Sequence, residues 1–301
     1  MSKAFTLILV GCWVCACGGL HIAGAQNLTY QDIEKLPVPP ADHRIAYGID
    51  PEQFGELRLP EGRGPHPVAV IIHGGCWYAE YNIKHVGNFA AALTKAGVAT
   101  WTLEYRRIGN PGGGWPGTFE DVARGTDSLR SFARTHRLDL KRVVVVGHSA
   151  GGQLALWLAS RRRLPRSNVL YAPKPLPIRG VVSLAGITDM SAFGQRCGGA
   201  VGKLLGGTPE KFLERYQQTS PIEIVPLGIR QWLIHGARDS IVPVEQSRNY
   251  EAVANGAGDK VTLIVLDDAG HFDLIAPQSS AWSVVQKAVR AASIKQPNSR
   301  P

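Results

Sequence analysis

The sequence predicts a doubly wound α/β fold, in which a mostly parallel β-sheet carries helices on both faces. Two observations lead to this prediction: runs of four to six apolar, often β-branched residues recur along the chain, and helix-length segments separate them. Continuous apolar runs are typical of strands that are buried on both faces, and such strands belong to parallel sheets.

The predicted elements follow in a regular order. Residues 44–48 and 54–59 could form an antiparallel hairpin at one edge of the sheet, and the turn-rich residues 60–67 lead from it to the first central strand. The strands expected after it are 68–72, 98–103, 143–146, 180–184, 231–235 and 261–266. The expected helices are 84–96, 119–135, 153–160 and 280–292.

The first 25 residues resemble a secretory signal. Lys3 precedes an apolar run over residues 4–17, and Ala23-Gly24-Ala25 matches a cleavage site. We therefore expect a mature chain that begins near Gln26 and is secreted or periplasmic. The apolar run is too short for a comfortable membrane span of about 20 residues. The alternative is lipoprotein anchoring at Cys17, within an imperfect lipobox.

The rest of the chain is expected to form one domain. Residues 26–43 form a lead whose proline-containing stretch, 36–40, predicts an extended connector. The α/β domain spans 44–293, and a tail spans 294–301. Within the domain, residues 189–226 are glycine-rich and interrupt the alternation of strands and helices. We expect them to be only partly helical and to act as a small cap over the strand ends.

Composition limits the possible partners. The 301 residues are 44% hydrophobic and 19% charged, with a formal net charge of +9. No basic patch interleaved with aromatic residues is present, so a nucleic-acid partner is not expected. The arginines at 161–163 are explained by the end of a helix, where cations are favoured. Beyond the first 25 residues the only cysteines are Cys76 and Cys197, and either a disulfide or two free thiols is compatible with them.

The most informative motif is Gly147-His148-Ser149-Ala150-Gly151, which follows four consecutive valines and precedes a predicted helix. A G-x-S-x-G sequence between a strand and a helix is typical of a nucleophile elbow, where a strained turn exposes the serine hydroxyl. Ser149 is therefore the expected nucleophile.

A second glycine motif lies at the end of an earlier predicted strand, in His73-Gly74-Gly75-Cys76-Trp77. Glycines there leave backbone N–H groups accessible. We expect the amides of Gly74 and Gly75, with that of Ala150, to form an oxyanion hole. The alternative is a tight turn that only lets the chain leave the sheet.

An acid and a base are expected from two later loops. Asp239 and His271 each follow a predicted strand, and the chain order Ser149, Asp239, His271 is the one expected for this type of elbow. The imidazole would accept the serine proton and the carboxylate would orient the imidazole.

Other histidines and acids are weaker choices. His148 should point away from Ser149, whereas His73 and His235 suit structural hydrogen bonds. Asp267 and Asp268 are too close in sequence to His271 to approach it from a separate loop, and Asp189 follows an earlier strand. The residues proposed for the substrate pocket are Cys76, Trp77 and Trp115, with plain packing as the alternative.

These motifs together resemble the α/β-hydrolase superfamily, and in particular its secreted esterase/lipase and kynurenine formamidase-like branch. His73 to Trp77 is similar to the H-G-G-x-W motif of that branch, and the elbow matches it too. Glu104-Tyr105-Arg106 is similar to its D-Y-R element, with Glu in place of Asp. The likeness covers about residues 44–293.

The resemblance implies an α/β-hydrolase fold and hydrolysis of a small-molecule ester or amide through an acyl-enzyme, with no metal or cofactor. A carboxylesterase of the EC 3.1.1 type is expected first. The alternatives are a kynurenine formamidase-like amide hydrolase, a prolyl-oligopeptidase-type peptidase, or a catalytically silent binding protein of the same fold.

Overall fold

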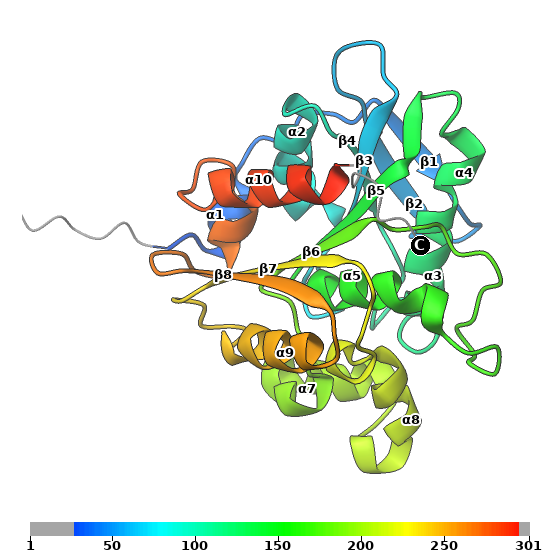
Figure 1. Ribbon diagram of the computed structural model, residues 1–301, viewed down its shortest axis with the longest axis vertical. Coiled ribbons are helices and arrows are strands. Elements are labelled where there is room, and N and C mark those ends of the chain that lie inside the picture. Colours follow the sequence, from blue (N-terminus) through cyan, green and yellow to red (C-terminus); the bar gives the residue numbers. More distant parts are fainter. Residues whose placement is uncertain (1–26, 295–301) are drawn as a thin grey trace, which may run out of the picture.

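A computed structural model of the chain describes residues 27–294 and shows an eight-stranded sheet between two layers of helices (Figure 1). The strand order is β1-β2-β4-β3-β5-β6-β7-β8. The first two strands, β1 (His43–Ala46) and β2 (Phe54–Arg58), form the expected antiparallel edge. The remaining strands run parallel to one another: β3 (His66–Ile72), β4 (Ala99–Leu103), β5 (Leu138–His148), β6 (Gly180–Leu184), β7 (Arg230–Gly236) and β8 (Lys260–Leu266). The predicted fold class is confirmed.

Helices cover both faces because alternate residues of the central strands point to opposite sides. In β5, Val143 and Val145 belong to one buried apolar cluster, and Val144 and Val146 belong to another. The first cluster is covered by α3 (Gly117–Asp127), α4 (Leu129–Phe132), α5 (Ala150–Ser160) and α9 (Glu245–Gly256). The second is covered by α2 (Gly87–Lys95) and α10 (Trp282–Ser293), with η1 (Ile83–Val86) leading into α2.

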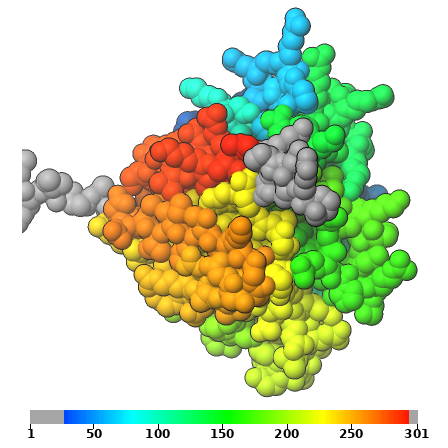
Figure 2. Space-filling view, viewed as in Figure 1, coloured from blue at the N-terminus to red at the C-terminus, as the bar shows by residue number. Residues whose placement is uncertain are grey.

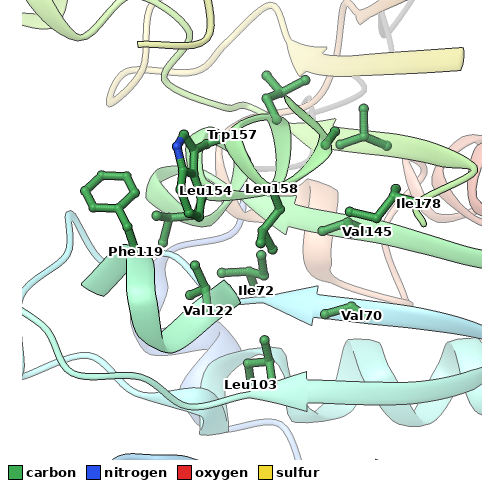
Figure 3. Close-up of a cluster of buried hydrophobic side chains, with 14 of the residues drawn as sticks. Val70, Ile72, Leu103, Phe119, Val122, Val145, Leu154, Trp157, Leu158 and Ile178 are labelled. Atoms are coloured by element: carbon green, nitrogen blue, oxygen red, sulfur yellow. The ribbon is translucent and has the colours of Figure 1, made fainter. Parts of the chain in front are cut away.

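Helix α5 begins at the elbow and lies in the interior. All of its residues are buried, and Figure 3 shows Leu154, Trp157 and Leu158 projecting from it into the cluster against the sheet. Trp157 meets the ring of Phe119 from α3 edge to face, with ring centroids 5.0 Å apart. A helix packed on all sides gives its first residue a fixed position relative to the strands.

The structure differs from the sequence prediction in several elements. The helix expected over residues 119–135 is divided into α3 and α4, and α9 was not predicted because few of its side chains, such as Tyr250 and Ala254, are apolar and buried. Residues 36–40 have no regular structure, as expected, but the lead contains a short helix, α1 (Tyr30–Glu34). The insertion is more helical than expected, with α6 (Met190–Phe193), α7 (Arg196–Leu205), α8 (Pro209–Thr219) and the short turn η3 (Pro221–Glu223).

Figure 2 shows one face of the molecule in space-filling form. The orange and red carboxyl-terminal segments lie together on this face, and the loop between β2 and β3 projects beyond them at the top. Among residues 27–294 there is no helix with the length and apolar character needed to cross a bilayer. The predicted signal, residues 1–25, lies outside the described residues.

Parallel strands place their carboxyl ends at one edge of the sheet, which is where open α/β sheets bind ligands. The predicted site residues follow β3, β5, β7 and β8, and these four strands all run in the same direction. The fold therefore directs loops that are distant in sequence toward one place.

Candidate active site

Ser149 occupies a strained turn between β5 and α5. Its backbone angles are φ 57° and ψ −122°, in a region that residues with a side chain rarely adopt, and its N–H donates to the Leu184 carbonyl at 2.8 Å. The flanking glycines are required by close backbone contacts. A Cβ on Gly147 would lie 1.9 Å from the Gly151 oxygen, and one on Gly151 would lie 2.2 Å from the Ile72 oxygen. The geometry is that of a nucleophile elbow.

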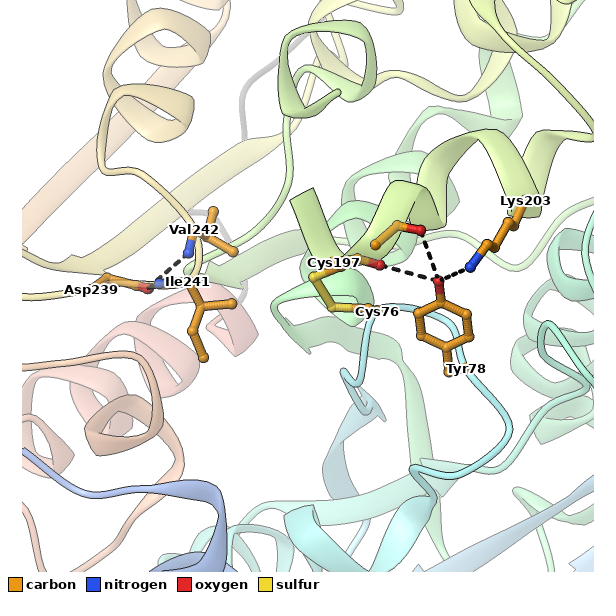
Figure 4. Close-up of a disulfide and its surroundings, with 8 residues drawn as sticks. Cys76, Tyr78, Cys197, Lys203, Asp239, Ile241 and Val242 are labelled. Atoms are coloured by element: carbon orange, nitrogen blue, oxygen red, sulfur yellow. Dashed lines mark hydrogen bonds between the residues drawn. A yellow bond between two sulfur atoms is a disulfide. The ribbon is translucent and has the colours of Figure 1, made fainter. Parts of the chain in front are cut away.

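His271 and Asp239 form a hydrogen-bonded pair at this edge of the sheet. His271 Nδ1 lies 2.6 Å from Asp239 Oδ2, and since a carboxylate can only accept, Nδ1 carries the proton. The other carboxylate oxygen accepts from the amides of Ile241 and Val242 at 2.8 and 2.9 Å, as Figure 4 shows. These contacts hold the ring so that Nε2 is left as its basic nitrogen.

The Asp239 side chain is fully buried. Burial by itself raises the pKa of a carboxyl group, but hydrogen bonds from His235 and His271 and from the Val242 amide outweigh it, and the Asp239 pKa is lowered. The carboxylate therefore stays charged well below neutral pH and can stabilise an imidazolium at His271.

Ser149 and His271 line the same cavity. The hydrogen bonds of residues 27–294 include the His271–Asp239 pair but none between Ser149 Oγ and the His271 ring. Serine–histidine contacts of this kind are often long without substrate and shorten when substrate binds. The structure thus joins two of the three expected residues directly, and the third lines the same cavity.

Three further histidines, His73, His148 and His235, differ from His271 in their contacts. His73 Nδ1 donates to the Gly74 carbonyl at 2.9 Å, and His235 uses both nitrogens, on Ser247 Oγ and the Val242 carbonyl. Both fit the structural role expected for them. The expected orientation of His148 is wrong: its ring lies against that of His271, with centroids 4.5 Å apart, and lines the cavity. Its Nε2 donates to the His271 carbonyl at 3.0 Å, so the ring supports the loop that carries His271.

Two buried histidines near the site are held neutral. Burial, together with the proximity of other histidines, lowers the pKa of His148 well below its usual value. The same causes lower the pKa of His85 to about 3. Neither ring has a carboxylate within hydrogen-bonding distance in the described chain, whereas His271 has Asp239 and His73 has Glu104. Burial without a carboxylate partner therefore keeps His85 and His148 uncharged.

The expected oxyanion glycines lie next to the nucleophile. A Cβ on Gly74 would come within 3.0 Å of Ser149 Cβ, and Gly75 has a φ of 102°. Within residues 27–294 the amides of Gly74, Gly75 and Ala150 donate to no protein acceptor, and Gly75 lines the cavity. These groups remain a predicted oxyanion hole.

Glu104 explains how the glycine loop is held. Its Oε1 lies 2.9 Å from His73 Nε2 and pairs with Arg107, and its Oε2 accepts from the Ile83 amide at 3.0 Å. Burial opposes ionisation, but His73 and Arg107 lower the Glu104 pKa overall. The Tyr105 hydroxyl adds a bond of 2.8 Å to the His73 carbonyl. This network connects the end of β4 to the end of β3, the strand that leads into Gly74 and Gly75.

The cavity has a volume of about 440 Å³, and its walls differ from those expected. Cys76 lines it, but Trp77 and Trp115 do not. Trp77 is fully buried and directs its Nε1–H at Gln153, 3.3 Å away, while Trp115 packs against Phe119. Both are packing residues, the alternative allowed for them. No part of the insertion 189–226 lines the cavity.

The wall that the sequence did not predict comes from the lead. Residues 27–31 line the cavity together with residues that follow the strands: Tyr81, His85, Arg238, Ser240, Ile241, Gly270 and Phe272. In Figure 1 the blue amino-terminal segment lies beside the orange segment after β8, and Asn27 Nδ2 donates to the Asp268 carbonyl at 2.7 Å. Proximity to His271 in sequence could have indicated Phe272, but residues 27–31 carry no motif.

The insertion reaches the site through a disulfide. Cys76 in the glycine loop is bonded to Cys197 at the start of α7, which decides between the two alternatives left open for these cysteines. Figure 4 also shows the Tyr78 hydroxyl donating to the Cys197 carbonyl at 3.1 Å and accepting from Lys203 at 3.0 Å. The insertion is thus attached beside the cavity instead of covering it.

This arrangement of side chains at the carboxyl edge of a mostly parallel sheet is that of an α/β-hydrolase, and the protein has that fold. The model of the BD-FAE family, an α/β-hydrolase family, matches residues 56–253, and the chain belongs to that family. The matched range includes Ser149 and Asp239 and ends before His271.

Individual relatives are more distant. The chain is 27% identical over 258 residues to esterase LipC of Mycobacterium tuberculosis, covering 77% of this chain and 60% of that protein. It is 22% identical over 237 residues to kynurenine formamidase of Drosophila melanogaster, covering 76% and 74%. The chain spans between 53% and 60% of the length of the first curated relatives. A truncated carbohydrate esterase from gut microbiota has the same fold, with a TM-score of 0.73 and 23% identity over 85% of this chain and 99% of the other.

The neutral histidines predict a loss of stability in weak acid. Histidine in an unfolded chain has a pKa near 6.5. Below that pH the unfolded chain therefore binds protons that His85 and His148 do not bind in the folded state. For each such ring the unfolding free energy should fall by about 2 kcal/mol between pH 7 and pH 5. Urea unfolding of His85→Phe should therefore show a weaker pH dependence over this window. A pH profile as steep as that of the unaltered protein would contradict the assignment.

The disulfide predicts a measurable contribution to stability. It closes a loop with a sequence separation of 121 residues, and removal of a cross-link of this kind lowers the unfolding free energy by roughly 2–4 kcal/mol. Cys76→Ala, Cys197→Ala and the double variant should lose similar amounts in denaturant unfolding, because each removes the same bond. Two titratable thiols in the folded, unreduced protein would show that the bond is absent.

Proposed function

We propose that this protein is a serine hydrolase that cleaves carboxylic esters of small molecules through an acyl-enzyme. The observation that carries the proposal is the His271–Asp239 hydrogen bond of 2.6 Å on the cavity that Ser149 also lines. The esterase relatives and the family membership support ester hydrolysis over other reactions of this fold.

In the proposed reaction, Ser149 Oγ attacks the acyl carbon while His271 Nε2 takes the hydroxyl proton. Asp239 stabilises the imidazolium that results, and the amides of Gly74, Gly75 and Ala150 donate to the oxygen that becomes negative. His271 then returns the proton to the departing alcohol oxygen as its bond to the acyl carbon breaks. Water, activated by the same imidazole, attacks the acyl-enzyme and releases the acid. Every side chain and amide that these steps use belongs to this chain.

A second candidate is amide hydrolysis of the formamidase kind, which the similarity to a kynurenine formamidase favours. The same three residues would act, and only the leaving group differs. Rates on p-nitrophenyl acetate, N-formylkynurenine and an aminoacyl amide would separate an esterase from a formamidase or a peptidase. A catalytically silent relative would hydrolyse none of them.

The mechanism predicts a graded loss of activity in the three variants. Ser149→Ala and His271→Ala should each lower kcat by about 10⁴-fold or more on p-nitrophenyl acetate, and Asp239→Ala should lower it somewhat less because the acid acts through the base. The melting temperature of Ser149→Ala should stay nearly unchanged. A fluorophosphonate probe should label the unaltered chain but not this variant. Full activity of Ser149→Ala would refute the nucleophile, and a larger loss in Asp268→Ala than in Asp239→Ala would refute the acid.

We also propose that the chain is exported and cleaved after Ala25. The signal-like residues 1–25 support export, and the Cys76–Cys197 disulfide is of a kind that persists in oxidising compartments. Expression of the full chain in a host with a secretion pathway should yield an exported protein with the intact mass of residues 26–301. A mass increased by lipid on a chain that begins at Cys17 would instead establish membrane anchoring.

A further inference from the structure

The segment that follows the proposed cleavage site is bound to the loop of the proposed base. Asn27 Nδ2 donates to Asp273 Oδ2 at 3.0 Å, and the same oxygen accepts from the Gly270 amide at 2.7 Å. The other oxygen of Asp273 accepts from the Leu28 amide at 3.4 Å. Asp273 is only 7% exposed, so these bonds are largely protected from water. One buried carboxylate therefore connects residues 27 and 28 to the loop that carries His271.

This attachment places Tyr30 among aromatic rings that line the cavity. Its ring centroid lies 5.2 Å from that of Tyr81, and 5.8 Å from those of both His85 and Phe272. All four rings line the cavity that contains Ser149. The surface consists of the uncharged imidazole of His85 and the rings of Tyr30, Tyr81 and Phe272. At these separations it can pack against another flat ring.

The aromatic surface lies beside the His271 ring. Phe272 is the next residue in the chain, with its ring centroid 5.0 Å from that of His271. The group that leaves the acyl carbon must receive a proton from His271 Nε2, so its oxygen has to lie beside that ring. The rings around Tyr30 therefore border the leaving group rather than the acyl group.

We propose that residues 27–31 form the leaving-group wall of the active site, and that Tyr30 selects esters whose alcohol carries a flat ring. Asn27 acts as a positioning residue, because it holds this wall against the His271 loop through Asp273 and the Asp268 carbonyl. The proposal rests on the proposed ester hydrolysis and adds the class of alcohol that the site prefers.

The test compares two acetate esters whose alcohols have similar acidity, benzyl acetate and ethyl acetate. The ratio of their kcat/KM values is measured for the unaltered protein and for Tyr30→Ala, Tyr30→Phe and Asn27→Ala. Tyr171→Ala is the matched control, because Tyr171 is also partly buried and does not line the cavity. A ratio of rates on the same protein cancels losses that come only from reduced stability.

Tyr30→Ala should lower the benzyl-to-ethyl ratio by about three- to tenfold, mainly through a higher KM for benzyl acetate, since one aromatic contact is lost. Tyr30→Phe should restore most of the ratio, because it keeps the ring. Asn27→Ala should also lower the ratio, whereas Tyr171→Ala should leave the ratio unchanged.

The outcomes separate this proposal from the one on which it rests. If the unaltered protein hydrolyses both esters and Tyr30→Ala has an unchanged ratio, the leaving-group wall is refuted and the esterase proposal stands. A ratio that falls equally in Tyr30→Ala and Tyr171→Ala would also refute it. If the unaltered protein hydrolyses neither ester and does not react with a fluorophosphonate, both proposals fall together.

Discussion

The site depends on the close backbone approach at the turn between β5 and α5. Ser149 can hold a positive φ only because Gly147 and Gly151 let the start of α5 lie against β5 and β3 at distances that a Cβ would prevent. The strain of this turn is opposed by the burial of the whole of α5 between α3 and the sheet. A helix that could shift would release the turn, so the packing of apolar residues far from the cavity determines where the serine hydroxyl lies.

Electrostatics assign the histidines around that turn to different roles. The rings of His73, His85, His148 and His271 lie close to one another, and an imidazolium at any of them would disfavour charge on the others. Two buried carboxylates resolve the competition, because Asp239 contacts His271 and Glu104 contacts His73. The rings without such a partner are held neutral. Charge can therefore develop at His271 during the proposed reaction without His85 or His148 competing for the proton.

The cavity is assembled from parts of the chain that are far apart in sequence. Most of its lining comes from loops that follow parallel strands, and residues 27–31 form a further wall. Cys76, which also lines it, is bonded to Cys197 of the insertion. The carboxylate of Asp273 and the disulfide thus have comparable roles, since each fixes a peripheral segment to a loop of the site. The insertion between β6 and β7 was expected to be the cap, yet none of its residues lines the cavity, whereas residues 27–31 near the amino terminus do.

The sequence by itself determined the sheet and the elbow, and it predicted Ser149, Asp239 and His271 as the site residues, because each depends on local chemistry. β-branched runs specify buried strands, glycines at fixed spacing permit a strained turn, and a polar residue directly after a parallel strand must lie at the carboxyl edge of the sheet. Tertiary structure alone decided that Trp77 and Trp115 pack in the interior, that His148 lies against His271, that the two cysteines are bonded, and that residues 27–31 form a wall. These outcomes arise from contacts between segments separated by up to 246 residues, and no local propensity or spacing encodes which distant side chain will fill a given space.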